Sequence, residues 1–331
     1  MTADESTMAE GDEFAGERPA PLDVETVRRL SRLQPWRSAA HILLEWALIV
    51  AAAGLCARFF HPALYLLAVL FIGARQHALG ILLHDGTHYR LFHNRTLNDW
   101  VTELLLASPF LILGLHTYRR NHFPHHRHLN TPADPDWLRK QTPEWEFPQR
   151  PGRLARHLIP YALGGGFIKV VVGILRMERR SGARPSAASP SERILGLARA
   201  AFTAALGVAL WRFAGGRALF LYWIVPLMTW MQLAFQVRSI AEHFAISGRR
   251  GVYAQSRTVL AGLLDRAFIA SKNVGYHLEH HLYPSVPFYR LPELHRLLMA
   301  QAEYRQSAHL TRGYWGVLRE CVGAGGERPS P

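Results

Sequence analysis

The sequence contains four apolar segments that are each close to the length of a membrane-spanning helix. They occur in two pairs, at about residues 39–60 and 62–83 and at about 197–213 and 219–237. A helix needs roughly 20 apolar residues to cross the core of a bilayer. Because only a few residues separate the members of each pair, the pairs predict two helical hairpins. We therefore expect an all-α integral membrane protein with four transmembrane helices.

Composition and charge favour a membrane protein over a nucleic-acid-binding protein. Hydrophobic residues make up 49% of the 331-residue chain and charged residues only 19%, below the roughly 25% of ordinary soluble domains. The formal charge of +13 comes from arginines scattered between the apolar segments, not gathered in one basic domain. The segments linking the hairpins are rich in Arg and Lys, so the positive-inside rule places both termini in the cytoplasm. We expect a protein of a bacterial inner membrane that binds no nucleic acid.

The rest of the sequence predicts a single membrane domain at residues 23–322 with a disordered tail at each end. Residues 1–22 are acidic, and the short segment 323–331 contains few apolar residues, so neither tail can bury enough surface to fold alone. Within the domain, we expect a short surface helix at about 24–33 and an amphipathic helix at about 292–308.

Two other apolar stretches, at about 100–116 and 154–175, are interrupted by Pro, Gly or ionisable residues. The first is short for a single crossing, and we expect both to be interfacial or re-entrant. Residues 176–193 are rich in Arg, Ser, Ala and Pro, a composition typical of a solvated linker.

Eight histidines form three clusters with helical spacing. The clusters are His84 and His88; His122, His125 and His126; and His277, His280 and His281. Residues at i, i+3 and i+4 share one face of a helix, so the imidazoles of each cluster can converge. Neutral imidazole binds iron, zinc, copper and nickel, and eight rings can hold two transition-metal ions without specifying the element.

A ninth candidate ligand, His243, lies at the end of the last predicted span, on the same side as the clusters. Ionisable residues at such positions have a functional role or reach the interface. We expect His116, His128 and His295 to be surface or hydrogen-bonded histidines. Neighbouring polar groups commonly accept the second imidazole N–H and orient the ring, and the candidates for this role are Asp85, Asp134, Asp136, Ser239, Glu242, Asn273 and Glu279. Asp134 and Asp136 also suit a simple turn.

The order and spacing of the three clusters, with a hairpin before and between them, resemble the membrane-bound fatty acid desaturase superfamily. The resemblance covers about residues 43–298. It implies four spans and a cytosolic helical cap that holds a non-haem di-iron centre. In that superfamily the clusters supply eight ligands and a later histidine supplies the ninth, which corresponds to His243. Some members have an asparagine four residues before that histidine, where this chain has Ser239.

The resemblance implies an O2-dependent oxidoreductase that introduces a double bond into an acyl chain of a lipid. The histidine pattern also serves hydroxylases and ketolases of carotenoid-like substrates and desaturases of small secondary metabolites. An apolar substrate would enter from the bilayer. The sequence shows no haem or ferredoxin motif, so we expect a separate electron donor, either a ferredoxin or a b-type cytochrome with its reductase.

Two other classes of protein fit the sequence less well. A membrane metal transporter should carry polar ligands near the middle of its spans, and the predicted spans lack them, with Arg75 and His77 lying toward the cytoplasmic end. A non-catalytic membrane protein on the same fold would have little use for nine clustered ligands. We therefore favour an enzyme.

Overall fold

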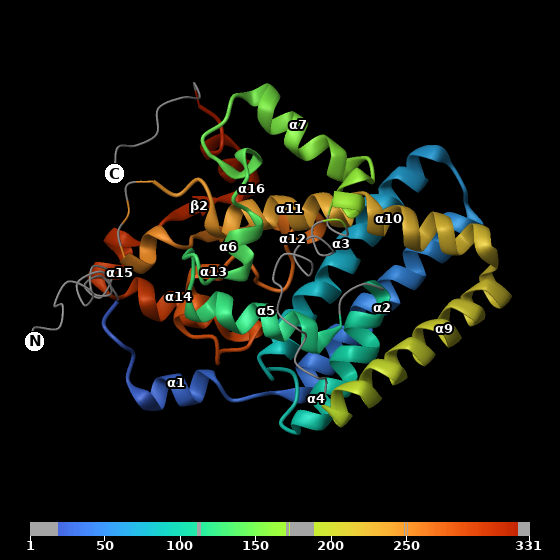
Figure 1. The fold of residues 1–331 in the computed structure, drawn as a ribbon, viewed down its shortest axis with the longest axis horizontal. Coiled ribbons are helices and arrows are strands. Elements are labelled where there is room, and N and C mark those ends of the chain that lie inside the picture. The colour runs from blue at the N-terminus through green and yellow to red at the C-terminus, as the bar shows by residue number, and fades with distance from the viewer. Residues whose placement is uncertain are drawn as a thin grey trace, which may run out of the picture.

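The computed structural model describes residues 19–110, 114–169, 172, 189–247, 249 and 251–323. Its long helices gather on one side, and short helices and loops form the other side (Figure 1). Nearly all of both predicted tails, and most of the linker predicted at 176–193, lie outside the described residues.

The first predicted hairpin consists of α2 (Pro35–Arg58) and α3 (Pro62–Thr87). Pro62 occupies the first turn of α3, where its missing N–H leaves no hydrogen bond unmade. The His61 side chain accepts a hydrogen bond from the backbone N–H of Ala63, which caps the helix. Of the most apolar stretch of each helix, 72% is buried in α3 but only 22% in α2. The central helix of the structure is therefore α3, and it also carries the first histidine pair.

The second predicted hairpin forms a helical run from Pro190 to His243 that is broken at Gly215. It comprises α9 (Pro190–Leu219), the π-helix η5 (Phe220–Ile224), α10 (Val225–Met228) and α11 (Trp230–His243). Gly215 has a φ of 81°, a conformation that glycine adopts without strain. The chain reverses direction between α9 and α10 (Figure 1), and Gly215 lies in the predicted turn.

The described residues contain three helices long and apolar enough to cross a membrane, or up to four if a bent pair forms one more span. The bent pair joins residues 95–110, comprising α4 (Arg95–Val101), the π-helix η2 (Thr102–Ala107) and η3 (Ser108–Phe110), to α5 (Leu115–Arg127) at an angle of 96°. Such a bend fits a broken or re-entrant segment, as we expect for residues 100–116.

The remaining elements are short. The helices are α1 (Val24–Leu30), α6 (Pro135–Arg139), η4 (Pro143–Trp145), α7 (Pro151–Ala162), η6 (Gly251–Ala254), α12 (Leu263–Phe268), α13 (His277–Leu282), η7 (Phe288–Arg290), α14 (Leu291–Met299), α15 (Ala302–Ser307) and α16 (Gly313–Glu320). Two three-residue strands, β1 (Thr258–Leu260) and β2 (Leu310–Arg312), pair in parallel with Thr258 opposite Leu310.

The sequence predicted neither strand, and the amphipathic helix predicted at 292–308 is in fact two helices. The helical hydrogen bonding stops at Ala300, and Gln301 is extended. This break directs the Tyr304 side chain inward, where it is fully buried and donates a hydrogen bond to Glu279. The hydrogen bond from Tyr304 to Glu279 is thus made by the residue pair that the second, separate helix brings together.

The packing of α3 depends on a close approach to the second hairpin at Gly73. A Cβ atom at this position would lie 2.9 Å from the backbone nitrogen of Met231 and 2.9 Å from Cβ of Trp230. Contacts this short involve backbone that cannot move aside freely. Gly73 therefore lets α3 and α11 pack directly against each other.

We predict that Gly73→Val destabilises the protein by about 1–3 kcal/mol, because the added side chain overpacks the interface between α3 and α11. Thermal unfolding of the purified protein in detergent measures the change. Gly54→Ala in α2 is the matched control, since a Cβ there meets nothing within 4 Å and Ala favours a helix by up to about 1 kcal/mol. Equal stability of both variants would contradict the packing assigned to Gly73.

Candidate metal centre

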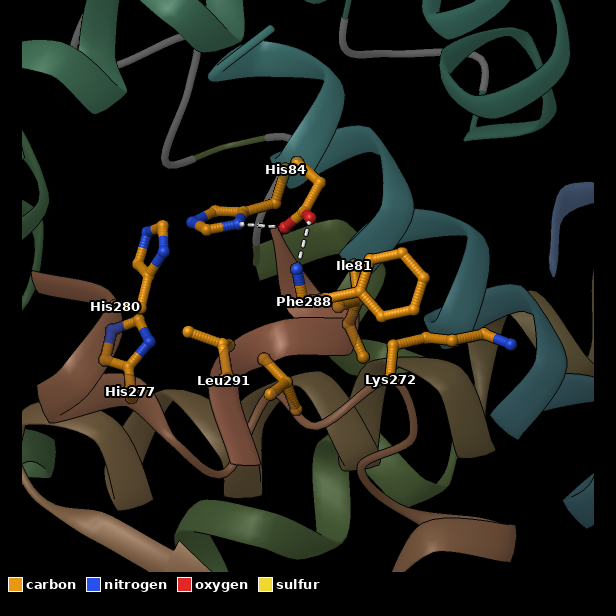
Figure 2. A pocket seen from close by; sticks show the side chains of 9 residues that line it. Ile81, His84, Lys272, His277, His280, Phe288 and Leu291 are labelled. Atoms are coloured by element: carbon orange, nitrogen blue, oxygen red, sulfur yellow. Dashed lines mark hydrogen bonds and ion pairs between the residues drawn. The ribbon is translucent and has the colours of Figure 1, made fainter. Parts of the chain in front are cut away.

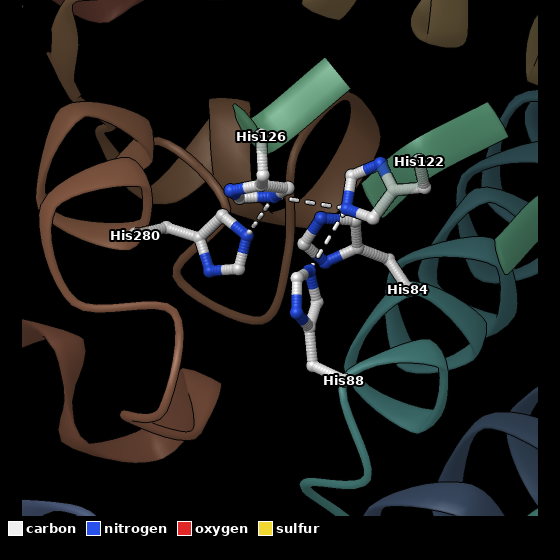
Figure 3. Close-up of side chains that lie close together, drawn as sticks. All are labelled: His84, His88, His122, His126 and His280. Atoms are coloured by element: carbon white, nitrogen blue, oxygen red, sulfur yellow. Dashed lines mark hydrogen bonds between the residues drawn. The ribbon is translucent and has the colours of Figure 1, made fainter. Parts of the chain in front are cut away.

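The nine predicted histidines converge into two adjacent groups. The first group is His84, His88, His122, His126 and His280 (Figure 3), and the second is His125, His243, His277 and His281. Within each group one ring nitrogen per residue lies within 4.8 Å of all the others. The ligand candidates come from the ends of α3 and α11 and from the helices α5 and α13.

Helical geometry explains why α5 and α13 each serve both groups. Successive residues of a helix are about 100° apart around its axis. The adjacent residues His125 and His126 therefore point to different groups, and so do His280 and His281. Because α5 and α13 each contribute histidines to both groups, the two groups lie next to each other.

The closest contacts between the rings of different histidines join Nε2 atoms. The Nε2 atom of His122 lies 2.8 Å from that of His88 and 3.0 Å from that of His126. In the other group, the Nε2 atom of His277 lies 3.0 Å from that of His243 and 3.1 Å from that of His281. The Nε2 atom of His84 is buried without a hydrogen-bond partner. Clustered nitrogen lone pairs and an unpartnered buried nitrogen fit a bound cation in each group.

Burial keeps the imidazoles in the form that binds metal. Desolvation, followed by the charges of Arg90 and Arg119, lowers the pKa of His88 to about 3. Desolvation and neighbouring imidazoles hold the pKa of His277, His280 and His281 well below its ordinary value near 6.5. A low dielectric disfavours the charged ring, so these histidines are neutral at pH 7.

Three histidines of the four-membered group have a partner at Nδ1, on the side away from the other rings. His125 Nδ1 donates to Asp134 Oδ2 at 2.9 Å, and His243 Nδ1 donates to the backbone oxygen of Gln255 at 2.9 Å. His277 Nδ1 lies 3.2 Å from Glu242 Oε1. Such partners fix the tautomer and leave the Nε2 lone pair for a metal. Asp134 and Glu242 thus occupy the positions expected of orienting carboxylates.

The other orienting candidates do not contact an imidazole in this way. Asp85 Oδ1 is 3.7 Å from His84 Nδ1, too far for a hydrogen bond, and Asp85 Oδ2 accepts a bond from the Phe288 backbone. Asp136 pairs with Arg139 and Lys140. The remaining candidates lie elsewhere: Ser239 is buried in α11, and Asn273 donates to the backbone oxygen of Phe288.

Glu279 lies between ligand candidates in the sequence but points away from them. Its buried carboxylate accepts hydrogen bonds from Thr258 and Tyr304 and contacts His295 Nδ1. This network ties α13 to β1, α14 and α15. His295 is therefore a hydrogen-bonded histidine, as expected.

Two neighbours of the site were not identified from the sequence. The ring of Tyr118 stacks on that of His122 at a centroid distance of 5.2 Å. The buried side chain of Arg238 donates from Nε to Glu242 Oε1. The spacing of Arg238 and Glu242, four residues apart on a helix, is a signal that could have found this pair.

A small cavity of about 10 Å³ adjoins both groups (Figure 2). That volume is about the space of one water molecule. The cavity is lined by Ile81, His84, Asp85, Lys272, Val274, His277, His280, Phe288 and Leu291. A reacting group held there would be next to the candidate ligands His84, His277 and His280.

Comparison with known proteins connects this arrangement to a family. The family model described as Fatty acid desaturase matches residues 60–313. Dihydrorhizobitoxine desaturase of Bradyrhizobium elkanii is 32% identical over 301 residues, which cover 88% of this chain and 83% of that protein. The chloroplastic omega-3 fatty acid desaturase of Brassica napus is 25% identical over 281 residues, 78% of this chain and 67% of that protein.

A third relative is the chloroplastic sn-2 acyl-lipid omega-3 desaturase (ferredoxin) of Arabidopsis thaliana, which is 26% identical over 282 residues, 78% of this chain and 60% of that protein. All nine converging histidines lie inside the region that the family model matches. The resemblance noted in the sequence is confirmed, and the chain belongs to the fatty acid desaturase family.

Proposed function

We propose that the protein is a membrane-bound non-haem di-iron desaturase that uses O2 to convert a C–C single bond of its substrate into a double bond. The observation that carries the proposal is the convergence of nine imidazoles into two adjacent groups in a member of a desaturase family. Imidazole nitrogens suit iron, and two groups side by side suit two ions. The nine histidines would be both the metal ligands and the catalytic residues.

When bound, two iron ions supply the oxidising power for hydrogen removal, with O2 reduced to two water molecules by two substrate hydrogens, two electrons and two protons. The protein contributes positioning and exclusion of water. His84, His277 and His280 line a small cavity, and the reacting carbons would have to lie close to these rings. Asp134 and Glu242 would hold two of the ligands in their metal-binding orientation.

The first candidate substrate is an acyl chain of a lipid. The names of the two plant relatives state that they act on fatty acyl groups, and the helices long and apolar enough to cross a membrane support a substrate taken from a bilayer. The substrate would then enter from the bilayer and reach the cytoplasmic side of a bacterial inner membrane.

A second candidate is a small metabolite. The relative with 32% identity is by name a dihydrorhizobitoxine desaturase, which supports a substrate smaller than a lipid. Addition of oxygen instead of loss of hydrogen would indicate the hydroxylase or ketolase reaction.

Electrons would come from a separate ferredoxin, or from a b-type cytochrome with its reductase. The name of the Arabidopsis thaliana relative includes ferredoxin. The formal charge of +13 favours an acidic carrier, because complementary charge accelerates encounter.

We predict that His280→Ala lowers product formation by more than about 100-fold, because loss even of a residue that only orients a metal ligand costs 10–100-fold. The readout is mass spectrometry of lipids and small metabolites from expressing cells, searched for products two mass units lighter or one oxygen heavier than their precursors. His128→Ala is the control, since His128 is exposed at the end of α5. Full activity in the His280 variant would rule out the proposed centre.

We also predict that the metal-free folded protein loses stability as the pH falls from about 7 toward 5. The pKa values of His88, His277, His280 and His281 are lowered in the folded state, so below about 6.5 the unfolded chain binds protons that the folded protein does not. Stability therefore rises with pH in this window, on the order of 1 kcal/mol per imidazole and pH unit.

The measurement is the thermal unfolding temperature of the metal-free protein in detergent at pH 7.5 and pH 5.5. Replacing all four of these histidines with glutamine should weaken the pH dependence. An unfolding temperature that stays constant or rises on acidification would contradict the neutral, buried state assigned to the imidazoles.

A further inference from the structure

The two histidine groups differ in the partners of their Nδ1 atoms. In the four-membered group, Nδ1 atoms lie 2.9 Å from Asp134, 2.9 Å from the Gln255 carbonyl and 3.2 Å from Glu242. In the five-membered group, the nearest carboxylate is Asp85, 3.7 Å from His84 Nδ1. Among the described residues, no Nδ1 atom of the five-membered group donates a hydrogen bond to a protein acceptor. The outer support of the imidazoles is therefore concentrated on one of the two groups.

Of the three supports, only Glu242 is itself held by a charged side chain. Arg238 lies one helical turn earlier on α11 and donates from Nε to Glu242 Oε1, the same oxygen that faces His277. Arg238 is 5% exposed and Glu242 is 9% exposed. A charge-assisted hydrogen bond in a buried site is strong and directional, so the guanidinium fixes the position of the carboxylate oxygen.

The pair also connects two elements that carry ligands. Arg238, Glu242 and His243 belong to α11, whereas His277 is the first residue of α13. The Nε2 atoms of His243 and His277 are 3.0 Å apart. A change in the position of Glu242 therefore acts directly on His277. It also acts on His243, which is the next residue in α11. Both histidines belong to the four-membered group.

We propose that Arg238 and Glu242 form a positioning pair for His277 and that this pair supports metal binding at the four-histidine position alone. The inference rests on the proposed function, because it assumes two metal ions. Neither residue is a ligand in this proposal. Glu242 orients the imidazole so that Nε2 faces the metal, and Arg238 orients Glu242.

The test is iron retention by the purified protein loaded with iron under anaerobic conditions. A ferrous chelator is titrated against the wild type and against Glu242→Gln and Arg238→Gln. We expect each variant to lose affinity for one iron ion by about 10–100-fold, as is usual when an outer partner of a metal-ligating histidine is removed. Affinity for the other ion should match the wild type. Mössbauer spectra of protein loaded with iron-57 should show a change in one of two iron signals.

Two further variants separate positioning from general damage. Arg238→Lys keeps the charge but replaces the planar guanidinium with a point charge, so it should weaken the same ion by less than Arg238→Gln does. Glu320→Gln is the matched control, because Glu320 pairs with buried Arg257 at 2.6 Å and also contacts His309 and Thr311, none of which is a candidate ligand. It should retain both ions with wild-type affinity.

The iron titrations distinguish failure of the positioning pair from failure of the proposed function. Unchanged affinity for both ions in Glu242→Gln, or an equal loss of both, would overturn the assignment of the pair to one position. The Arg238→Lys titration gives the same decision if Glu242→Gln does not fold. A wild-type protein that retains fewer than two iron ions would overturn the proposed function itself, and this inference with it.

Discussion

The structure depends on a concentration of nitrogen lone pairs that the protein does not satisfy by itself. Nine imidazoles lie in two groups whose nitrogens are within 4.8 Å of one another, and His84 Nε2 is buried with no partner. Burying polar groups without hydrogen-bond partners costs folding free energy. In the absence of metal, packing elsewhere in the fold must offset this cost. Much of that support comes from α3, which is largely buried and packs against α2, α11 and η2.

A buried ion cluster connects the apolar helices to the third histidine cluster. Glu45 of α2 pairs with Arg75 of α3 and with Lys272, which lies shortly before α13. Lys272 and Asn273 both have positive φ values, 55° and 57°. Each such non-glycine residue costs on the order of 1–3 kcal/mol, and the contacts of Lys272 with Glu45 and His41 offset part of this cost. The strained turn leads the chain into His277, so the apolar helices α2 and α3 help to set the direction of α13.

The sequence predicted that the histidines converge because the candidate ligands follow helical spacing. His122, His125 and His126 share a turn of α5, and the 100° between neighbours separates His125 from His126. The orienting carboxylates were harder to predict. Glu242 and Glu279 both stand beside a ligand in the sequence, yet Glu242 faces His277 whereas Glu279 turns to Thr258 and Tyr304. That difference arises from how α13 packs on α15 and β1, which local spacing does not encode. The same packing accompanies the break at Ala300 in the helix predicted at 292–308.

The central claim is that both histidine groups bind iron through imidazole nitrogen. Iron K-edge X-ray absorption of the purified, iron-loaded protein tests it most directly, because the spectrum reports the element, its ligands and a second metal nearby. We predict iron coordinated mainly by imidazole nitrogens, with scattering from the outer atoms of the rings, and weaker ring scattering in His280→Ala, which lacks one of the five imidazoles of the first group. Iron bound mainly by sulfur, or iron that His280→Ala leaves unchanged, would contradict it.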